Sequence, residues 1–118
     1  MIAVIFEVLP SEGERATYLG LAADLRPLLD RIDGFISIER FQSLADPNKL
    51  LSLSFWRDEE AVKAWRNGAE HRAAQGAGRN GVFADYRLRI AAVVRDYGLN
   101  HRDEAPADSR QWHEGNAA

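Results

Sequence analysis

Apolar side chains occupy both alternating sets of positions from Met1 to Leu9, and only Glu7 interrupts them. A short run that is apolar on both sides is typical of a β-strand covered on both faces. From Ser11 onward apolar residues recur every three or four positions, with two glutamates in the first turn. This spacing predicts a long amphipathic helix. Pro27 lies inside the pattern, so we expect a kink or a break there.

A β-hairpin is predicted after this helix. Asp33-Gly34 turns the chain, and the strand-like segments 35–42 and 49–56 then flank a polar loop rich in turn-forming residues. Two such segments joined by turn formers usually become antiparallel neighbours in a sheet.

The start of the second helix is well marked. Asp58 can accept a hydrogen bond from a backbone N–H of the first turn, and two glutamates follow it where the helix dipole favours negative charge. Gly68 weakens this helix, and a further helical segment over residues 69–75 is predicted beyond it. From Phe83 to Arg95 the chain alternates again between two sets of side chains, which predicts a long final strand.

The order of these elements is βαββαβ, which predicts an α+β, ferredoxin-like fold: a four-stranded antiparallel sheet with two helical segments on one face. The other face mixes apolar with charged side chains, so we expect it to pack sheet to sheet against a second copy, as a dimeric α+β barrel. An open monomeric sheet is the alternative. Residues 1–96 form the predicted domain. Residues 97–118 form a polar tail, for which wrapping around the partner subunit and loose order both stay open.

The amino-acid composition argues against several kinds of site and partner. The 118 residues include no cysteine, which leaves no disulfide and no thiolate nucleophile or metal ligand. Lysine and arginine number 15 against 18 acids, and the net charge of −3 offers no basic surface for nucleic acid. No apolar run reaches the roughly 18 residues of a membrane span, and the N-terminus lacks a signal peptide pattern. A cytoplasmic location is therefore expected.

Two motifs invite misinterpretation. Residues 76–81 match G-x-G-x-x-G letter for letter, but a helix is predicted before them and a strand after them, the reverse of a dinucleotide site. We predict a flexible turn there. His71, His101 and His113 are too dispersed for a credible metal cluster, so no metal site is predicted.

A pocket is predicted between the second helix and the sheet. Trp65 falls on the side of that helix that faces the sheet, and Phe83 and Tyr86 open the last strand. With His71 and Gln75 near its mouth, such a space would suit a flat aromatic ligand. The alternative is that these aromatic side chains only fill the core.

Several of these features, in this order, resemble the antibiotic biosynthesis monooxygenase family over about residues 1 to 95. They are the apolar first strand, Asp33-Gly34-Phe35, the hairpin ending Ser54-Phe55-Trp56, the Asp58-Glu59-Glu60-Ala61 cap, Trp65 followed by His71, and the final strand. The resemblance implies a homodimeric barrel whose better-known members oxidise polycyclic aromatic substrates with molecular oxygen and need neither flavin nor metal. Others in the superfamily bind and degrade haem, and many have no established activity.

The hypothesis that follows is a cofactor-independent monooxygenase for a small aromatic or polycyclic, phenol-like substrate. The candidate base or hydrogen-bond partner is His71, since an imidazole can accept a proton near neutral pH. Trp65 and Tyr86 would hold the substrate together with Phe83 and Gln75. Arg72 or Arg79 would stabilise an enolate-like oxygen.

Two alternatives stay open, and whether the chain is an enzyme stays open with them. One is a non-catalytic dimeric module that binds a small ligand. The other is a haem-binding or haem-degrading relative, a branch that uses a histidine of the second helical region as the iron ligand and an asparagine of the first strand. In this sequence Gln75 stands where that histidine is expected, and the first strand has no asparagine.

Overall fold

The computed structural model describes residues 1–77 and 81–115. A four-stranded antiparallel sheet has the order β2-β3-β1-β4. The strands are β1 (Ile2–Pro10), β2 (Phe35–Gln42), β3 (Leu50–Trp56) and β4 (Phe83–Ala92). The helices are α1 (Arg15–Leu29), α2 (Glu59–Arg66), α3 (Ala69–Ala77) and α4 (Ala107–Gly115). The predicted ferredoxin-like α+β fold is confirmed.

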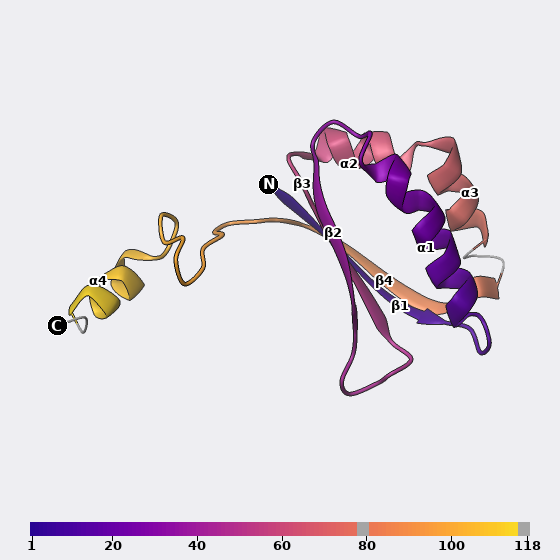
Figure 1. Ribbon diagram of the computed structural model, residues 1–118, viewed down its shortest axis with the longest axis horizontal. Helices are drawn as coiled ribbons and strands as arrows, with labels where there is room; N and C mark the ends of the chain where they lie inside the picture. The colour runs from indigo at the N-terminus through magenta and orange to yellow at the C-terminus, as the bar shows by residue number, and fades with distance from the viewer. Residues whose placement is uncertain (78–80, 116–118) are drawn as a thin grey trace.

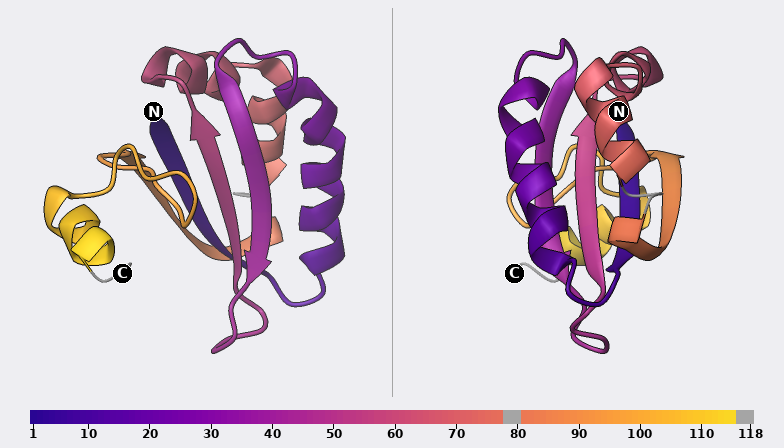
Figure 2. Two further views of the ribbon diagram at one scale, coloured as in Figure 1. Left: turned by 60° about the vertical axis from the view of Figure 1, so that its left-hand side comes forward. Right: turned by 90° about the vertical axis from the view of Figure 1, so that its right-hand side faces the viewer.

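Helices α1, α2 and α3 lie on one side of the sheet, whose other side they leave open (Figures 1 and 2). Alternate residues of β3 are buried beneath them, namely Leu50, Ser52, Ser54 and Trp56. The residues between them on β3 are half-buried. Strands β2 and β4 form the two edges of the sheet, so that β1 and β3 provide its centre.

The buried core consists of two clusters. One contains Leu29, Trp56, Ala61 and Val62, where the end of α1 and the start of α2 meet the sheet. The other contains Val8, Tyr18 and Leu50, where the first half of α1 meets β1 and β3. Members of both clusters border the cavity described below, which therefore interrupts the core instead of lying beside it.

The turn before β2 packs against the start of α2. Asp58 caps α2 as predicted, because its carboxylate accepts the backbone N–H of Ala61 at 2.9 Å. Gly34 has a φ of +92°, and a Cβ there would lie 2.8 Å from the Cβ of Ala61. The Arg57 guanidinium bonds both carboxylate oxygens of Asp33 at 3.1–3.2 Å. The predicted Asp33-Gly34 turn is confirmed, and its glycine is needed for both the backbone conformation and the close packing.

Two predictions about α1 are wrong. The helix begins at Arg15 and not at Ser11, because Ser11 to Glu14 form a turn in which the Glu14 N–H donates to the Ser11 carbonyl. Pro27 does not break the helix into two segments, since α1 continues to Leu29. Leu29 is only 2% exposed. Its burial holds the last turn against the core, which outweighs the one hydrogen bond that proline removes.

The end of the fold differs from its prediction in length. Strand β4 stops at Ala92, and the Val93 N–H then donates to the Met1 carbonyl at 3.0 Å. Residues 93–115, called the C-terminal arm below, leave the sheet and project away from it (Figure 1). The radius of gyration is 17.6 Å, against about 13.5 Å for a compact chain of this length. The arm accounts for the excess.

The arm is more ordered than a polar tail would suggest. Arg102 lies over the ring of Tyr97 at 5.1 Å, the side chain of Ala105 is buried, and helix α4 follows. Leu99 is 90% exposed.

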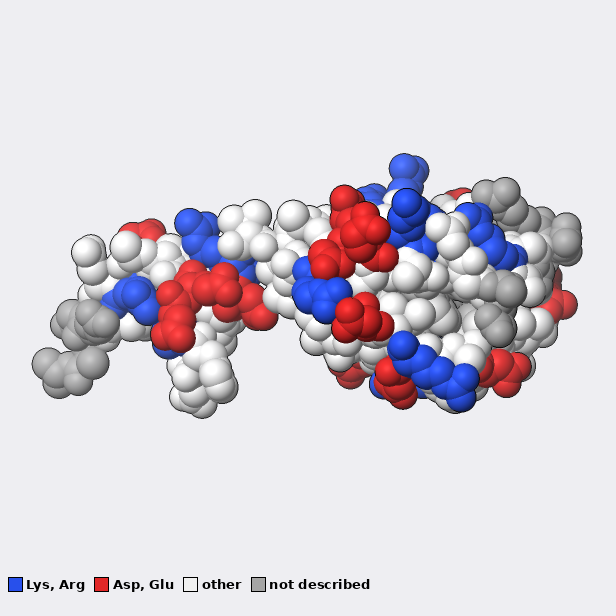
Figure 3. Space-filling model, turned by 90° about the horizontal axis from the view of Figure 1, so that it is seen from above, with Lys and Arg blue, Asp and Glu red and all other residues white. Residues whose placement is uncertain are grey.

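Charged side chains of both signs are interspersed on the surface seen from above, where the arm again projects from the body (Figure 3). Within the described ranges, no helix combines the length and the apolar character needed to cross a membrane.

Candidate functional site

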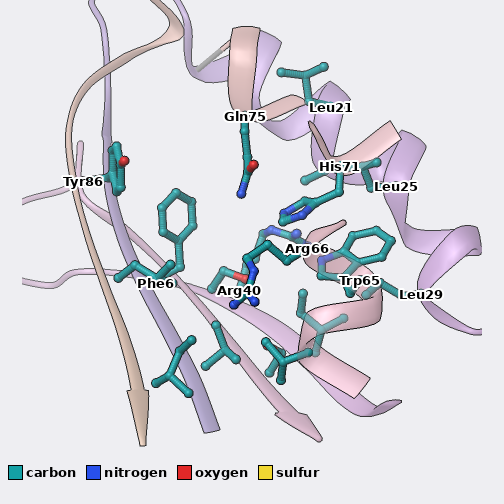
Figure 4. A pocket seen from close by; sticks show the side chains of 18 of the residues that line it. Phe6, Leu21, Leu25, Leu29, Arg40, Trp65, Arg66, His71, Gln75 and Tyr86 are labelled. Atoms are coloured by element: carbon teal, nitrogen blue, oxygen red, sulfur yellow. The ribbon is translucent and has the colours of Figure 1, made fainter. Parts of the chain in front are cut away.

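A cavity of about 310 Å³ lies between the sheet and the three helices (Figure 4). Helix α1 lines it along its length, α2 and α3 supply residues from Val62 to Gln75, and all four strands contribute to its floor. Most of the lining is aliphatic or aromatic. The volume lies at the lower end of the range for pockets that hold small molecules.

Four aromatic rings form one end of this cavity. The ring centroid of Phe6 lies 5.8 Å from that of Phe83 and 5.7 Å from that of Tyr86. Tyr18 packs edge-on against Phe83 at 5.6 Å. Tilted and edge-to-face pairs at these distances are favourable, so this end presents a pre-formed apolar surface suited to a ring.

Trp65 and His71 form the opposite wall. Their rings stack with centroids 4.8 Å apart and an interplanar angle of 25°. Gly68 separates α2 from α3, and its N–H donates to the Trp65 carbonyl at 3.1 Å. This break lets α3 turn back, which brings His71 over the indole.

The imidazole of His71 is half-buried, and its Nδ1 atom has no hydrogen-bond partner within the described part of the chain. Burial lowers the pKa of His71 below its ordinary value. The positive charge of Arg72 also lowers this pKa, while hydrogen bonding with the backbone of Arg66 and Trp65 raises it. His71 is therefore neutral at physiological pH, with one of its ring nitrogens unprotonated.

Polar groups gather between the two aromatic walls. Gln75 points its amide toward the centre of the cavity, and the guanidinium groups of Arg40 and Arg66 approach the same region (Figure 4). Ser52 and Ser54 lie on the floor. The hydroxyl of Ser54 accepts the indole N–H of Trp56 at 2.9 Å.

The structure brings together five of the residues predicted from the sequence. Trp65, His71, Gln75, Phe83 and Tyr86 all line this one cavity. Their predicted clustering is thus found, and their roles stay predictions.

The two predicted arginines are not part of the described cavity wall. Arg72 is exposed and its guanidinium donates to the side chain of Asn67. Arg79 lies outside the described residues. The glycine motif at residues 76–81 is also only partly described. Helix α3 precedes it and β4 follows it, so its context is the reverse of a dinucleotide site, as predicted.

Sequence reasoning missed Arg40 and Arg66, and it missed Phe6 and Tyr18 on the opposite wall. Arg40 had a detectable signal, because Ile38, Arg40 and Gln42 share one face of β2 and an apolar neighbour points that face inward. Within residues 1–77 and 81–115, no group of three or more His, Cys, Asp or Glu side chains is close enough to hold an ion.

The chain is similar to two curated proteins over most of its length. It is 52% identical over 100 residues to the jasmonate monooxygenase ABM of Pyricularia oryzae, which covers 85% of this chain and 46% of that protein. The chain thus spans about half the length of this fungal relative. It is 32% identical over 93 residues to YqjZ, an uncharacterised protein of Bacillus subtilis, and covers 79% of both chains.

Solved structures share the fold at low sequence identity. Rv0793 of Mycobacterium tuberculosis superposes with a TM-score of 0.73 at 15% identity, over 82% of this chain and 98% of that one. A conserved protein of Methanosarcina mazei superposes with a TM-score of 0.69 at 17% identity, over 76% and 89%. The model of one family, antibiotic biosynthesis monooxygenase, matches residues 1–77. The chain therefore belongs to the antibiotic biosynthesis monooxygenase family.

Proposed function

We propose that this protein is a monooxygenase that oxidises a small aromatic or polycyclic, phenol-like substrate with molecular oxygen and without a cofactor. One observation carries the proposal: a largely apolar cavity of about 310 Å³ contains a partly buried imidazole with a lowered pKa and an unpartnered nitrogen. Family membership and the name of the fungal relative support a monooxygenase activity.

In this proposal His71 is the catalytic base. The stack with Trp65 holds its ring in place, and its lowered pKa keeps it unprotonated. It removes a proton from an acidic C–H or O–H group of the substrate. Trp65 and Tyr86 position the substrate rings from opposite walls, with Phe83 behind Tyr86.

The oxygen step follows from the carbanion. It transfers one electron to O₂, the resulting substrate radical and superoxide combine, and the peroxide loses water. Overall, a CH₂ group and one O₂ give a carbonyl group and one water molecule. The amide of Gln75 faces the cavity and donates to the enolate-like oxygen of the deprotonated substrate. The apolar walls exclude water from these intermediates.

Oxygen consumption with anthrone as a model substrate tests this function. We expect uptake above the uncatalysed rate, with release of the oxidised ketone, and a loss of at least about 100-fold in His71→Ala. The thermal melt of the variant must stay cooperative for this comparison. Binding of anthrone without any catalysed oxygen uptake would instead identify a non-catalytic small-ligand module.

Haem binding is tested separately. Gln75, an amide, reaches into the cavity where a haem-degrading relative has its histidine. A titration with haem should produce no specific Soret band. A Soret band abolished by His71→Ala would revive the haem interpretation.

We further propose that two copies pair through their open sheet faces. On that face Glu7 lies between Lys49, at 3.3 Å, and Arg89, at 3.4 Å. These partners, Lys49 above all, lower the pKa of Glu7. Ile5, Leu53 and other half-buried apolar side chains surround this charged group. A sheet face on which apolar side chains surround paired charges is typical of an association surface.

The C-terminal arm fits the same assembly. It projects beyond the body with Leu99 exposed, and we propose that it lies on the partner subunit in the cytoplasm. Sedimentation at micromolar concentration should give a dimer mass, and deletion of residues 97–118 should weaken that dimer. A monomer mass for the full chain would refute the pairing.

A further inference from the structure

The polar middle of the cavity is positively charged. Arg40 enters it from β2 and Arg66 from the end of α2, and Figure 4 shows both guanidinium groups near the amide of Gln75. No Asp or Glu belongs to the described cavity wall. Arg40 is half-buried and Arg66 is exposed, so water screens the charge of Arg40 less. Without an acid in the described wall to balance it, this charge creates a local potential that attracts an anion.

Of the two guanidinium groups, that of Arg40 has a buried donor without a hydrogen-bond partner in the described part of the chain. Its Nε atom is buried and has no hydrogen-bond partner within the described residues. A guanidinium carries only donors, and a buried donor without an acceptor is unfavourable. Its strand neighbour in β3 is Ser52, which is buried and adds a hydroxyl next to it. The guanidinium group of Arg40 and the hydroxyl of Ser52 both belong to the cavity wall, and together they mark one end of a binding position.

Another arginine of the chain shows the geometry that such a group adopts when satisfied. Arg57 donates from both terminal nitrogens to the two carboxylate oxygens of Asp33, at 3.2 and 3.1 Å. This two-pronged arrangement is the preferred way for arginine to hold a carboxylate. Arg40 has the same fork, half-buried in a cavity that supplies no carboxylate from its own described wall.

The rest of the cavity limits what carries the anion. Leu21 and Leu25 line the side along α1, and the rings of Phe6 and Tyr86 close one end. With about 310 Å³ in all, there is room for a carboxylate and a compact cyclic body. A carboxylate matches one guanidinium fork in shape and charge, since both groups are planar and each carries a single charge.

We propose that the ligand of this cavity is a small monocarboxylic acid with a cyclic apolar body, and that Arg40 binds its carboxylate while Arg66 adds positive potential. This inference rests on the proposed function, because it names the substrate class of the same site. Arg40 is a binding residue in this scheme. It fixes the substrate by its acid group and so leaves the ring to lie between the aromatic cluster and the Trp65–His71 wall.

The test compares acids with neutral analogues of the same shape. Phenylacetic, cyclohexylacetic and 1-naphthaleneacetic acids, each beside its primary amide, are titrated calorimetrically into the full-length protein. We expect at least one acid to bind roughly tenfold or more tightly than its amide. The proposal is overturned if no acid binds more tightly than its amide.

Variants assign the preference to a residue. Arg40→Gln should abolish the difference between acid and amide, and Arg40→Lys should retain part of it, since lysine keeps the charge without the fork. Arg31→Gln is the matched control, because Arg31 is exposed and outside the cavity wall. An acid preference that survives in a cooperatively folded Arg40→Gln contradicts the proposal. If Arg40→Gln does not fold, the comparison of Arg40→Lys with the wild type decides.

Anaerobic titration separates this inference from the oxygenase proposal. Acid-selective binding without oxygen consumption on any substrate would remove the oxygenase and keep the carboxylate site. Oxygen consumption on a neutral substrate, combined with equal binding of acids and amides, would keep the oxygenase and remove the carboxylate site. A lower kcat in Arg40→Gln with an unchanged acid preference would assign Arg40 to the reacting oxygen and overturn the carboxylate site.

Discussion

Two tryptophans border the same cavity in different ways. Trp56 ends β3, is only 2% exposed, and donates its indole N–H to Ser54. Trp65 lies on α2, is half-buried, and stacks on an imidazole whose Nδ1 has no partner within the described residues. The first has its packing and its hydrogen bond satisfied by the fold. The second lines the cavity beside an imidazole whose hydrogen bonding the described residues leave incomplete. One region therefore maintains the structure and the other is available for chemistry.

The largest effect on stability is expected at Trp56. Trp56→Ala removes the largest fully buried side chain, and we expect the free energy of unfolding to fall by about 3–5 kcal/mol. Urea denaturation measures this change. A cost below about 1 kcal/mol would show that the two tryptophans do not differ as the structure indicates.

The buried hydrogen bond of Trp56 should account for the next largest effect. Ser54→Ala leaves the indole N–H as a buried donor without its acceptor, at a cost of about 1–3 kcal/mol. The same substitution in a Trp56→Phe background should cost much less, because phenylalanine has no N–H. Equal costs in the two backgrounds, measured in a double-mutant cycle, would show that the hydrogen bond contributes little.

Trp65 should behave in the opposite way. Trp65→Ala is expected to abolish ligand binding or oxygen uptake while it reduces the free energy of unfolding by only roughly 1–2 kcal/mol, since the side chain is half-buried. Trp65→Phe keeps most of the apolar volume and refines the result. A lowered melting temperature with unchanged ligand titration in Trp65→Phe would make Trp65 a structural residue like Trp56.

The smallest expected effect is the contribution of His71 to the pH dependence of the melting temperature. Burial lowers its pKa from the ordinary 6.5, so on acidification below that value the unfolded chain takes up a proton before the folded chain does. The melting temperature should therefore fall from about pH 7 to about pH 5, and His71→Gln should make this fall shallower. His101→Gln, a control at an exposed position in the C-terminal arm, should leave the fall unchanged. The same slope in both variants would contradict this assignment.

Local patterns predicted the fold and one wall of the site. The Asp58 cap and the apolar spacing that carries Trp65 toward the sheet depend on residues near each other in the chain. So do His71 and Gln75, one helical turn apart on α3. Helix caps and helical periodicity can be predicted from the sequence because they depend only on neighbouring residues.

The rest of the site depends on pairing between distant segments. In β2 the register shifts between Phe35 and Ser37, so Phe35 packs on the core while Ile36 is 53% exposed. This irregularity changes the phase of the strand, so alternation counted from Phe35 places Arg40 on the wrong face. Only the local pattern from Ile38 onward indicates its inward direction. Phe6 packs against Phe83 and Tyr86 only because β1 pairs with β4.

Strand β4 has a consequence for the handling of the unfolded or partly folded chain. It is a ten-residue strand at the edge of the sheet, and it carries the exposed side chains Leu88 and Ile90 on the cavity side. Segment 88–94 is rich in β-forming apolar residues and contains a single charge, Arg89. Such an edge is a template for intermolecular strand addition. Arg87, Arg89 and Arg95 act as gatekeepers against aggregation, and neutral substitutions at these positions should lower the soluble yield of the protein more than its melting temperature.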